Sequence, residues 1–265
     1  MMSEEERAKL IPAATILLVR DSEDGLEVFM VVRHHQIDFA SGALVFPGGK
    51  VDKRDTAEGV RDLVDGAEGL SDWELGMRVA AIREAFEESG VLLAREVGRD
   101  DIVPAARVAQ LESYRQRLND GDVGISDFLQ TEGLRLALDQ LVPFAHWITP
   151  DMMPKRFDTH FYVAAAPLDH VAIHDGSESV DSVWIKPDVA LAEAEAGTRT
   201  VIFPTRMNVW KLAQTASSAE AISVARSTEI VTVLPKVEKR EDGAVLKIPA
   251  EAGYCVTEEP LEKVM

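Results

Sequence analysis

Three glutamates close together on one predicted helix are the residues of this sequence best suited to chemistry. In the segment REAFEESGV, Glu84, Glu87 and Glu88 are spaced i, i+3 and i+4, so on a helix their carboxylates share one face. Like charges this close repel one another unless a cation lies between them. Carboxylate oxygens suit hard divalent ions. The spacing therefore predicts a site for Mg²⁺ or Mn²⁺, which would also help an acidic protein to hold phosphates.

The helix that must present these carboxylates is predicted over residues 71–89. Ser71 and Glu74 have the spacing of a capping box, and Gly90 is a typical C-terminal stop. Apolar residues recur at helical spacing along it, at Leu75, Val79, Ile82 and Phe86. This pattern indicates an amphipathic helix that packs on a core.

The elements around this helix are predicted from strand and turn signals. Residues 14–19 and 28–33 predict a hairpin, and a strand over 43–46 ends at Pro47-Gly48-Gly49, where the glycines free the backbone for a close approach. Residues 50–72 resemble an inserted loop with at most one short helix. Further helices are predicted over 105–118 and 125–138 and near Pro187 and Thr205, further strands over 146–149, 156–165 and 180–185, and a tail hairpin over 230–237 and 244–248.

The pattern R-E-x-x-E-E-x-G, together with the upstream FPGG, resembles the Nudix hydrolase family. The family's box reads G-x5-E-x7-R-E-U-x-E-E-x-G-U, with U aliphatic, and its second half matches Arg83, Glu84, Glu87, Glu88 and Gly90. The resemblance implies the α/β (α+β) class and a Nudix α/β/α sandwich, with a mixed sheet and helical insertions. It also implies metal-dependent hydrolysis of a nucleoside diphosphate linked to another moiety.

The box is interrupted, which leaves its first glutamate open. Between Gly49 and Arg83 lie 33 residues where the family has 13, an insertion of 20. Counting forward from Gly49 places the first glutamate at Asp55. Counting back from Arg83 places it at Leu75, with Glu74 adjacent.

Several segments resemble a coenzyme A diphosphatase subgroup of the family: residues 81–93, 147–150, 156–161 and 184–187. Coenzyme A or an acyl-CoA is therefore the first choice of substrate. Of the upstream signature R-[SA]-x3-R-x3-G-x3-FPGG, Arg33, Gly42 and FPGG match, whereas His34 and Asp38 replace the small residue and the second arginine. The alternatives are ADP-ribose, NADH and dinucleotides, or a non-catalytic Nudix-fold binding module.

The resemblance implies roles for individual residues. The metal ligands are Glu84, Glu87, Glu88 and the backbone carbonyl of Gly49, while Arg83 orients the glutamates. The residues expected to contact the substrate are Arg33, Gly48, Gly49 and Arg156.

Other candidates lie downstream of the box. Glu178, with Asp181 second, is the candidate for a further catalytic carboxylate from a later loop. Arg156, Asp158 and His160 alternate along one strand, so their side chains share a face that is predicted to line the cleft.

Composition restricts the partners. Lys and Arg total 28 against 46 Asp and Glu, and the net charge of −18 argues against nucleic acid and anionic membranes as partners. No apolar run approaches the ~18 residues of a membrane span, and the acidic start MMSEEERAKL is unlike a signal peptide, so a cytoplasmic location is predicted.

The predicted organisation is one Nudix domain with extensions at both ends. Residues 1–12 form a flexible N-terminus, 13–218 the domain, with insertions at about 50–72 and 105–140, and 219–265 a C-terminal extension. The 105–140 insertion either caps the active site or forms a homodimer surface.

Overall fold

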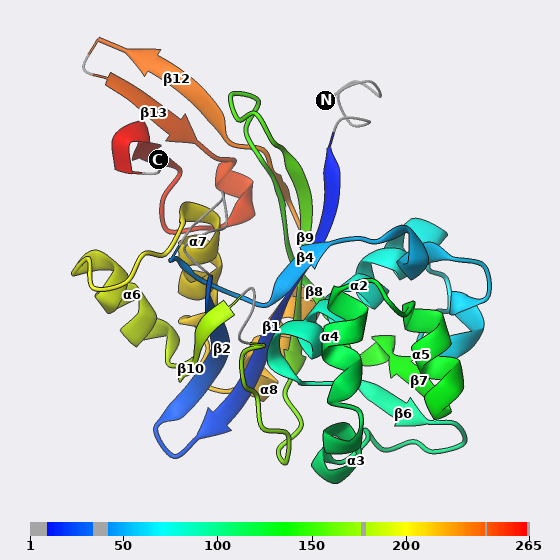
Figure 1. Cartoon of the computed structure of the whole chain (residues 1–265). Coiled ribbons are helices and arrows are strands. Elements are labelled where there is room, and N and C mark those ends of the chain that lie inside the picture. The colour runs from blue at the N-terminus through cyan, green and yellow to red at the C-terminus, as the bar shows by residue number, and fades with distance from the viewer. Residues whose placement is uncertain (1–9, 34–41, 176–178, 242, 264–265) are drawn as a thin grey trace.

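A mixed sheet lies at the centre of the computed structural model, which describes residues 10–33, 42–175, 179–241 and 243–263 (Figure 1). The strand order is β10-β2-β1-β9-β8-β11, with β3 paired to β2 and β4 paired to β1. The strands are β1 (Ile11–Ser22), β2 (Gly25–Arg33), β3 (Leu44–Val45), β4 (Gly48–Lys50), β8 (Val142–Ile148), β9 (Phe157–Ala165), β10 (Ser179–Ile185) and β11 (Thr232–Val233). The predicted hairpin is β1–β2, and β1 runs parallel to β9.

Helices cover both faces of this sheet (Figure 1). One face carries α2 (Asp72–Ser89), α3 (Ala105–Gln110), α4 (Ser113–Asn119) and α5 (Ile125–Glu132); the other carries α6 (Pro187–Glu195), α7 (Phe203–Leu212) and α8 (Ser218–Ser227). Along β1, Ile16 and Leu18 pack toward α2 while Leu17 and Val19 pack toward α7, so both faces are buried. The predicted α/β/α sandwich with a mixed sheet is confirmed.

The α2 helix begins and ends where its capping residues predict. The Ser71 side chain accepts a hydrogen bond from the Glu74 amide, and the Glu74 side chain reaches back to the Ser71 backbone. Gly90 follows the helix in the left-handed conformation, at φ 72°. The apolar side of α2 packs against β1 and β4 in the core. The glutamates of α2 therefore lie beside the FPGG turn.

Three predictions about the insertions are wrong. The helix expected over 105–118 is divided into α3 and α4, with Leu111 and Glu112 at the break. The helix expected over 125–138 ends at Glu132, because Gly133 takes the left-handed conformation. The chain then forms β7 (Leu134–Ala137), which lies between β5 (Val64–Asp65) and β6 (Ala94–Glu96). The loop expected over residues 50–72, with at most one short helix, instead contains two short 3-10 helices, Lys53–Thr56 and Val60–Leu63, followed by β5.

The C-terminal segment forms a small separate sheet. The tail hairpin consists of β12 (Lys236–Arg240) and β13 (Gly243–Lys247), with β14 (Glu258–Pro260) beside β13. The first part of the predicted tail strand, residues 232–233, instead extends the main sheet as β11. Among the described residues, no helix has the length and apolar character that crossing a bilayer requires.

Candidate active site

A buried arginine on α2 lies at the middle of the predicted glutamate cluster. Nη1 of Arg83 donates to Oε1 of Glu84 at 2.8 Å and to Oε2 of Glu87 at 3.1 Å. Its Nε and Nη2 donate to the two carboxylate oxygens of Asp55 at 2.9 and 3.0 Å, and Nη2 also donates to the Lys50 carbonyl at 2.9 Å. One planar guanidinium therefore fixes three carboxylates from two segments of the chain.

Asp55, which lies in the segment between Gly49 and α2, completes this network. It is 0% exposed and accepts a hydrogen bond from the Asp52 amide at 2.8 Å. Glu74, by contrast, accepts hydrogen bonds from the Ser71 amide and hydroxyl at the exposed start of α2. Of the two counts along the sequence, the forward count from Gly49 therefore reaches the carboxylate that contacts the box arginine.

The two glycines of the FPGG turn allow α2 to approach β4 closely. The Gly48 amide donates to Oε2 of Glu88 at 3.0 Å. A Cβ at Gly49 would lie 2.5 Å from Oε1 of Glu84, and a Cβ at Gly48 would lie 2.6 Å from the Ala14 carbonyl oxygen. A side chain at Gly48 would clash with the β1 backbone, and one at Gly49 would displace the Glu84 carboxylate.

The direction of the β4 backbone decides which glycine faces the glutamates. Gly49 pairs with Ala14 of β1, and the neighbouring Val51 amide donates to the Pro12 carbonyl at 3.0 Å. Backbone groups alternate in direction along an antiparallel strand, so those of Gly49 face β1 and those of Gly48 face α2. The carbonyl of Gly49, expected to be a ligand, thus lies on the side of β4 that pairs with β1.

The cluster holds more negative than positive charge. Burial, with the charge of Glu84 in addition and that of Arg83 in opposition, raises the pKa of Glu87 to about 7. Burial alone would lower the pKa of Arg83, but Glu84, Asp55 and Glu87 outweigh it and hold that pKa well above its usual value. An oxygen-only donor set with excess negative charge fits a hard divalent cation.

The segment that contains α2 is also similar in sequence to known proteins. A family model described as the NUDT19 Nudix domain matches residues 68–207, more than half of the chain. The chain belongs to the Nudix hydrolase family. A Caenorhabditis elegans protein named as a nudix hydrolase is 30% identical over 203 residues, which cover 76% of this chain and 60% of that protein. This chain thus spans less than two thirds of that relative's length.

Two further comparisons agree with this assignment. The acyl-coenzyme A diphosphatase NUDT19 of Xenopus laevis is 22% identical over 270 residues, which cover 86% of this chain and 71% of that protein. The crystal structure of a NUDIX hydrolase from Alicyclobacillus acidocaldarius superposes with a TM-score of 0.67 at 25% identity, covering 81% of this chain and 96% of that one. The predicted Nudix fold is confirmed, and Nudix hydrolases generally use divalent metal ions.

Arg33 and Arg156, the two arginines predicted to contact substrate in this Nudix hydrolase, differ in their surroundings. Arg33 ends β2 on the face that carries Phe29 and Val31, which is the face covered by α2. Its Nε is buried and has no hydrogen-bond partner in the part of the chain that the structure describes. The guanidinium of Arg156 is engaged locally, since Nε donates to the Thr149 carbonyl at 3.0 Å and Nη2 pairs with Asp151.

The predicted downstream carboxylates of the Nudix hydrolase remain predictions. Glu178 lies outside the described residues, as do His34 and Asp38 of the substrate signature. Asp181 is exposed on β10, where its carboxylate accepts a hydrogen bond from the Ser182 amide at 2.8 Å.

One buried residue beside the glutamates was not identified from the sequence. Arg115 of α4 donates from Nε to the Glu87 carbonyl at 3.2 Å and from Nη2 to the Ile173 carbonyl at 2.9 Å. A small cavity of about 90 Å³ is lined by Glu87, Glu112, Arg115, Gln116, Asn119 and Asp175. The apolar side chains of the insertion, including Leu111 and Leu118, are buried in the core that also contains α2. The insertion therefore lies at the edge of the glutamate cluster.

Proposed function

We propose that this Nudix hydrolase cleaves the diphosphate of coenzyme A or an acyl-CoA, with Mg²⁺ or Mn²⁺ held by Glu84, Glu87 and Glu88. The arrangement of these glutamates around Arg83 carries the proposal, because one guanidinium holds a negatively charged, oxygen-only set in place. A backbone carbonyl of the FPGG turn completes the set. The strand register favours Gly48 for this role over the Gly49 expected from the sequence.

The residues of the chain position the reacting groups. A bound divalent ion supplies charge neutralisation on the diphosphate and activation of water. Arg83 keeps Glu84 and Glu87 from turning away, and the Gly48 amide does the same for Glu88. In the reaction the water oxygen bonds to one phosphorus, the bond from that phosphorus to the bridging oxygen breaks, and the leaving phosphate keeps that oxygen.

Recognition of the anionic substrate is assigned to a local cation, because the whole chain carries a charge of −18. Arg33 supports this assignment, since its Nε is buried on the α2 face of the sheet without a hydrogen-bond partner among the described residues. A guanidinium there can bind a phosphate in a bidentate manner. The name of the Xenopus laevis relative, an acyl-coenzyme A diphosphatase, supports the coenzyme A moiety.

The test is product analysis with coenzyme A, acetyl-CoA, ADP-ribose, NADH and diadenosine polyphosphates in Mg²⁺ or Mn²⁺. We expect coenzyme A to yield a 3′,5′-bisphosphate nucleotide and phosphopantetheine. Glu87→Gln should reduce turnover by roughly 10³-fold or more, because it removes a ligand charge at the reaction centre. The matched control on the same helix is Glu74→Gln, which alters only an exposed cap.

Two other outcomes of this assay would contradict part or all of the proposal. Preference for ADP-ribose or NADH would contradict the coenzyme A proposal and keep the hydrolytic one. If no substrate is turned over while metal and nucleotide still bind, the chain is a Nudix-fold binding module.

A further inference from the structure

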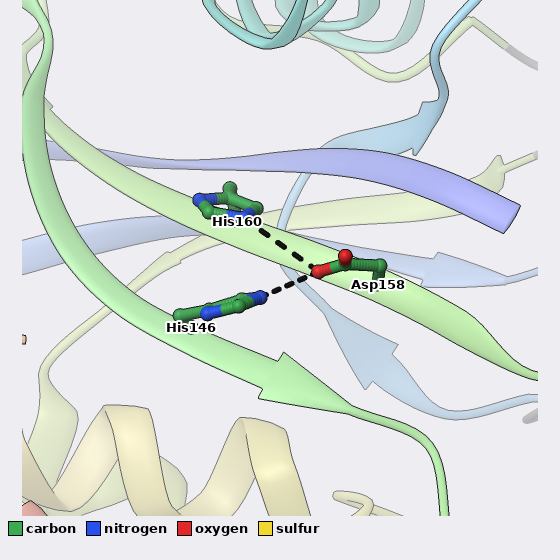
Figure 2. A group of neighbouring side chains, drawn as sticks. All are labelled: His146, Asp158 and His160. Atoms are coloured by element: carbon green, nitrogen blue, oxygen red, sulfur yellow. Dashed lines mark hydrogen bonds and ion pairs between the residues drawn. The ribbon is translucent and has the colours of Figure 1, made fainter. Parts of the chain in front are cut away.

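A second group of ionisable side chains lies on the central sheet, apart from the α2 glutamates. His146 of β8 pairs in register with His160 of β9, and Asp158 lies two residues before His160 (Figure 2). Nε2 of His146 lies 2.5 Å and Nε2 of His160 lies 3.6 Å from the same Asp158 oxygen, Oδ1. One ligand atom from each residue falls within 4.8 Å of the other two. Two imidazole nitrogens thus converge on one carboxylate.

The imidazoles are held in this orientation by their neighbours. Nδ1 of His146 is hydrogen-bonded at 2.8 Å to the hydroxyl of Thr232 on β11. Centroid to centroid, the ring of His160 lies 4.0 Å from the ring of His146 and 4.8 Å from the ring of Trp73, to which it is nearly perpendicular. A histidine that binds a metal through one ring nitrogen is typically oriented by a hydrogen bond at the other ring nitrogen.

One donor of the group has no hydrogen-bond partner. Nε2 of His160 is buried and, within the described residues, makes no hydrogen bond; Asp158 at 3.6 Å is beyond normal hydrogen-bonding distance. A buried polar atom without a partner is costly and needs an explanation. A cation bound between Nε2 and the carboxylate would provide one.

The position and the donor set separate this group from the α2 glutamates. His160 pairs with Ala14 of β1, which in turn pairs with Gly49 of β4. Two strand spacings therefore separate the His160 and Gly49 backbones, about 10 Å. The α2 site offers oxygen alone, whereas this group offers two nitrogens and one oxygen. Imidazole favours first-row transition ions, and carboxylate and carbonyl oxygens favour Mg²⁺.

We propose that His146, Asp158 and His160 bind one divalent first-row transition ion, such as Zn²⁺, at a site distinct from the diphosphate-hydrolysing centre. Two histidines and one carboxylate are a ligand set of zinc sites that keep a position open for water or another ligand. Ligand bonds of about 2.1 Å place donor atoms about 3.4 Å apart, so the widest pair would close by less than about 1.5 Å. The ion would replace the His146–Asp158 hydrogen bond with two metal bonds.

The experiment measures metal binding by the full chain after chelation and desalting. Zn²⁺ is titrated calorimetrically in excess Mg²⁺, which competes for the carboxylate site, and Co²⁺ is followed by its visible absorption. We expect one Zn²⁺ per chain, with affinity reduced at least roughly 100-fold in Asp158→Asn and in His146→Gln. Glu87→Gln and His170→Gln should bind as the wild type does, because His170 is buried elsewhere against the Val103 carbonyl.

The proposal is overturned if the wild type takes up no Zn²⁺ in excess Mg²⁺, or if both ligand variants bind as the wild type does. Circular dichroism and thermal denaturation report whether each variant folds. X-ray absorption of the Zn²⁺-loaded wild type needs no variant. Imidazole ligation supports the site, and oxygen-only ligation overturns it.

Discussion

The two ionisable clusters of this protein differ in what balances their charge. In the α2 cluster the cation belongs to the chain: Arg83 holds Asp55, Glu84 and Glu87, and these carboxylates outnumber it. In the strand cluster two imidazoles surround one carboxylate, Asp158. The first arrangement leaves negative charge for a hard cation to neutralise, whereas the second offers nitrogen ligands with little excess charge.

The pKa shifts in the two clusters have opposite signs although both are substantially buried. Burial raises the pKa of Glu87 to about 7. Arg83 opposes this shift but does not cancel it, because the same guanidinium also bonds Asp55 and Glu84. Burial also acts to raise the pKa of Asp158, but the hydrogen bond with His146 and the nearby imidazole of His160 outweigh it, and the pKa falls well below its usual value. Burial acts in the same direction on both carboxylates, so their opposite pKa shifts come from their neighbours: further carboxylates beside Glu87 and imidazoles beside Asp158.

The largest expected effect on stability and activity follows from replacing the guanidinium of Arg83 with an ammonium group of the same charge. In Arg83→Lys one ammonium cannot reach Asp55, Glu84 and Glu87 together, so buried carboxylates lose hydrogen bonds. We expect the free energy of unfolding to fall by about 3 kcal/mol and kcat/KM to fall by roughly 100-fold or more. Urea denaturation and steady-state kinetics measure both. Arg78→Lys is the matched control, and equal losses in the two variants would contradict the role given to Arg83.

Asp55 provides the next test, because it decides between the two counts along the interrupted box. Asp55→Asn keeps the shape but removes the buried charge facing Arg83. We expect a loss of about 1–3 kcal/mol in unfolding free energy and a measurable loss of kcat. Glu74→Gln should cost less than about 1 kcal/mol, since it weakens only a helix cap. A larger effect from Glu74→Gln would favour the backward count.

The parts of the fold that were predictable from the sequence depend on hydrogen bonds between near neighbours. Ser71, Glu74 and Gly90 delimit α2 because capping involves residues only a few positions apart. Gly133, which ends α5, was also a readable stop signal. The break between α3 and α4 at Leu111 contains neither glycine nor proline, so tertiary packing overrides local propensity there.

The unpredicted parts of the candidate site depend on contacts between distant segments. The length of the insertion does not show where between Gly49 and Arg83 the extra residues lie. The choice between Asp55 and Glu74 therefore required the three-dimensional structure. His146 approaches Asp158 only through the register of β8 and β9. Arg115 has the sequence context of a surface arginine, and its burial beside Glu87 depends on how the insertion packs.

Glu87 should make the metal-free protein less stable at neutral pH than it would be with a neutral side chain. Its folded-state pKa of about 7 lies above the usual 4.5, so the folded state binds the proton more tightly. Stability contributed by this group therefore falls as pH rises from about 4.5 to about 7. In chelator above pH 7 we expect Glu87→Gln to be more stable than the wild type by about 1–3 kcal/mol.

Urea denaturation at pH 5 and pH 7.5 measures this difference. The two proteins should approach one another in unfolding free energy at pH 5, and Mg²⁺ should raise the melting temperature of the wild type more than that of Glu87→Gln. Parallel pH dependences would show that the Glu87 carboxylate is fully compensated by Arg83.

The smallest expected effect concerns the neighbour of the strand cluster. Thr232→Val removes the hydroxyl 2.8 Å from Nδ1 of His146 but keeps the β-branched shape on β11. Because such a bond orients the ring, we expect Zn²⁺ affinity to fall roughly 10-fold, with little change in unfolding free energy or in diphosphate hydrolysis. Thr228→Val, whose hydroxyl donates to the Val224 carbonyl away from the strand cluster, is the control. Equal affinity in both variants would mean that strand pairing alone orients His146. A parallel loss of hydrolysis would mean that the two clusters act as one site.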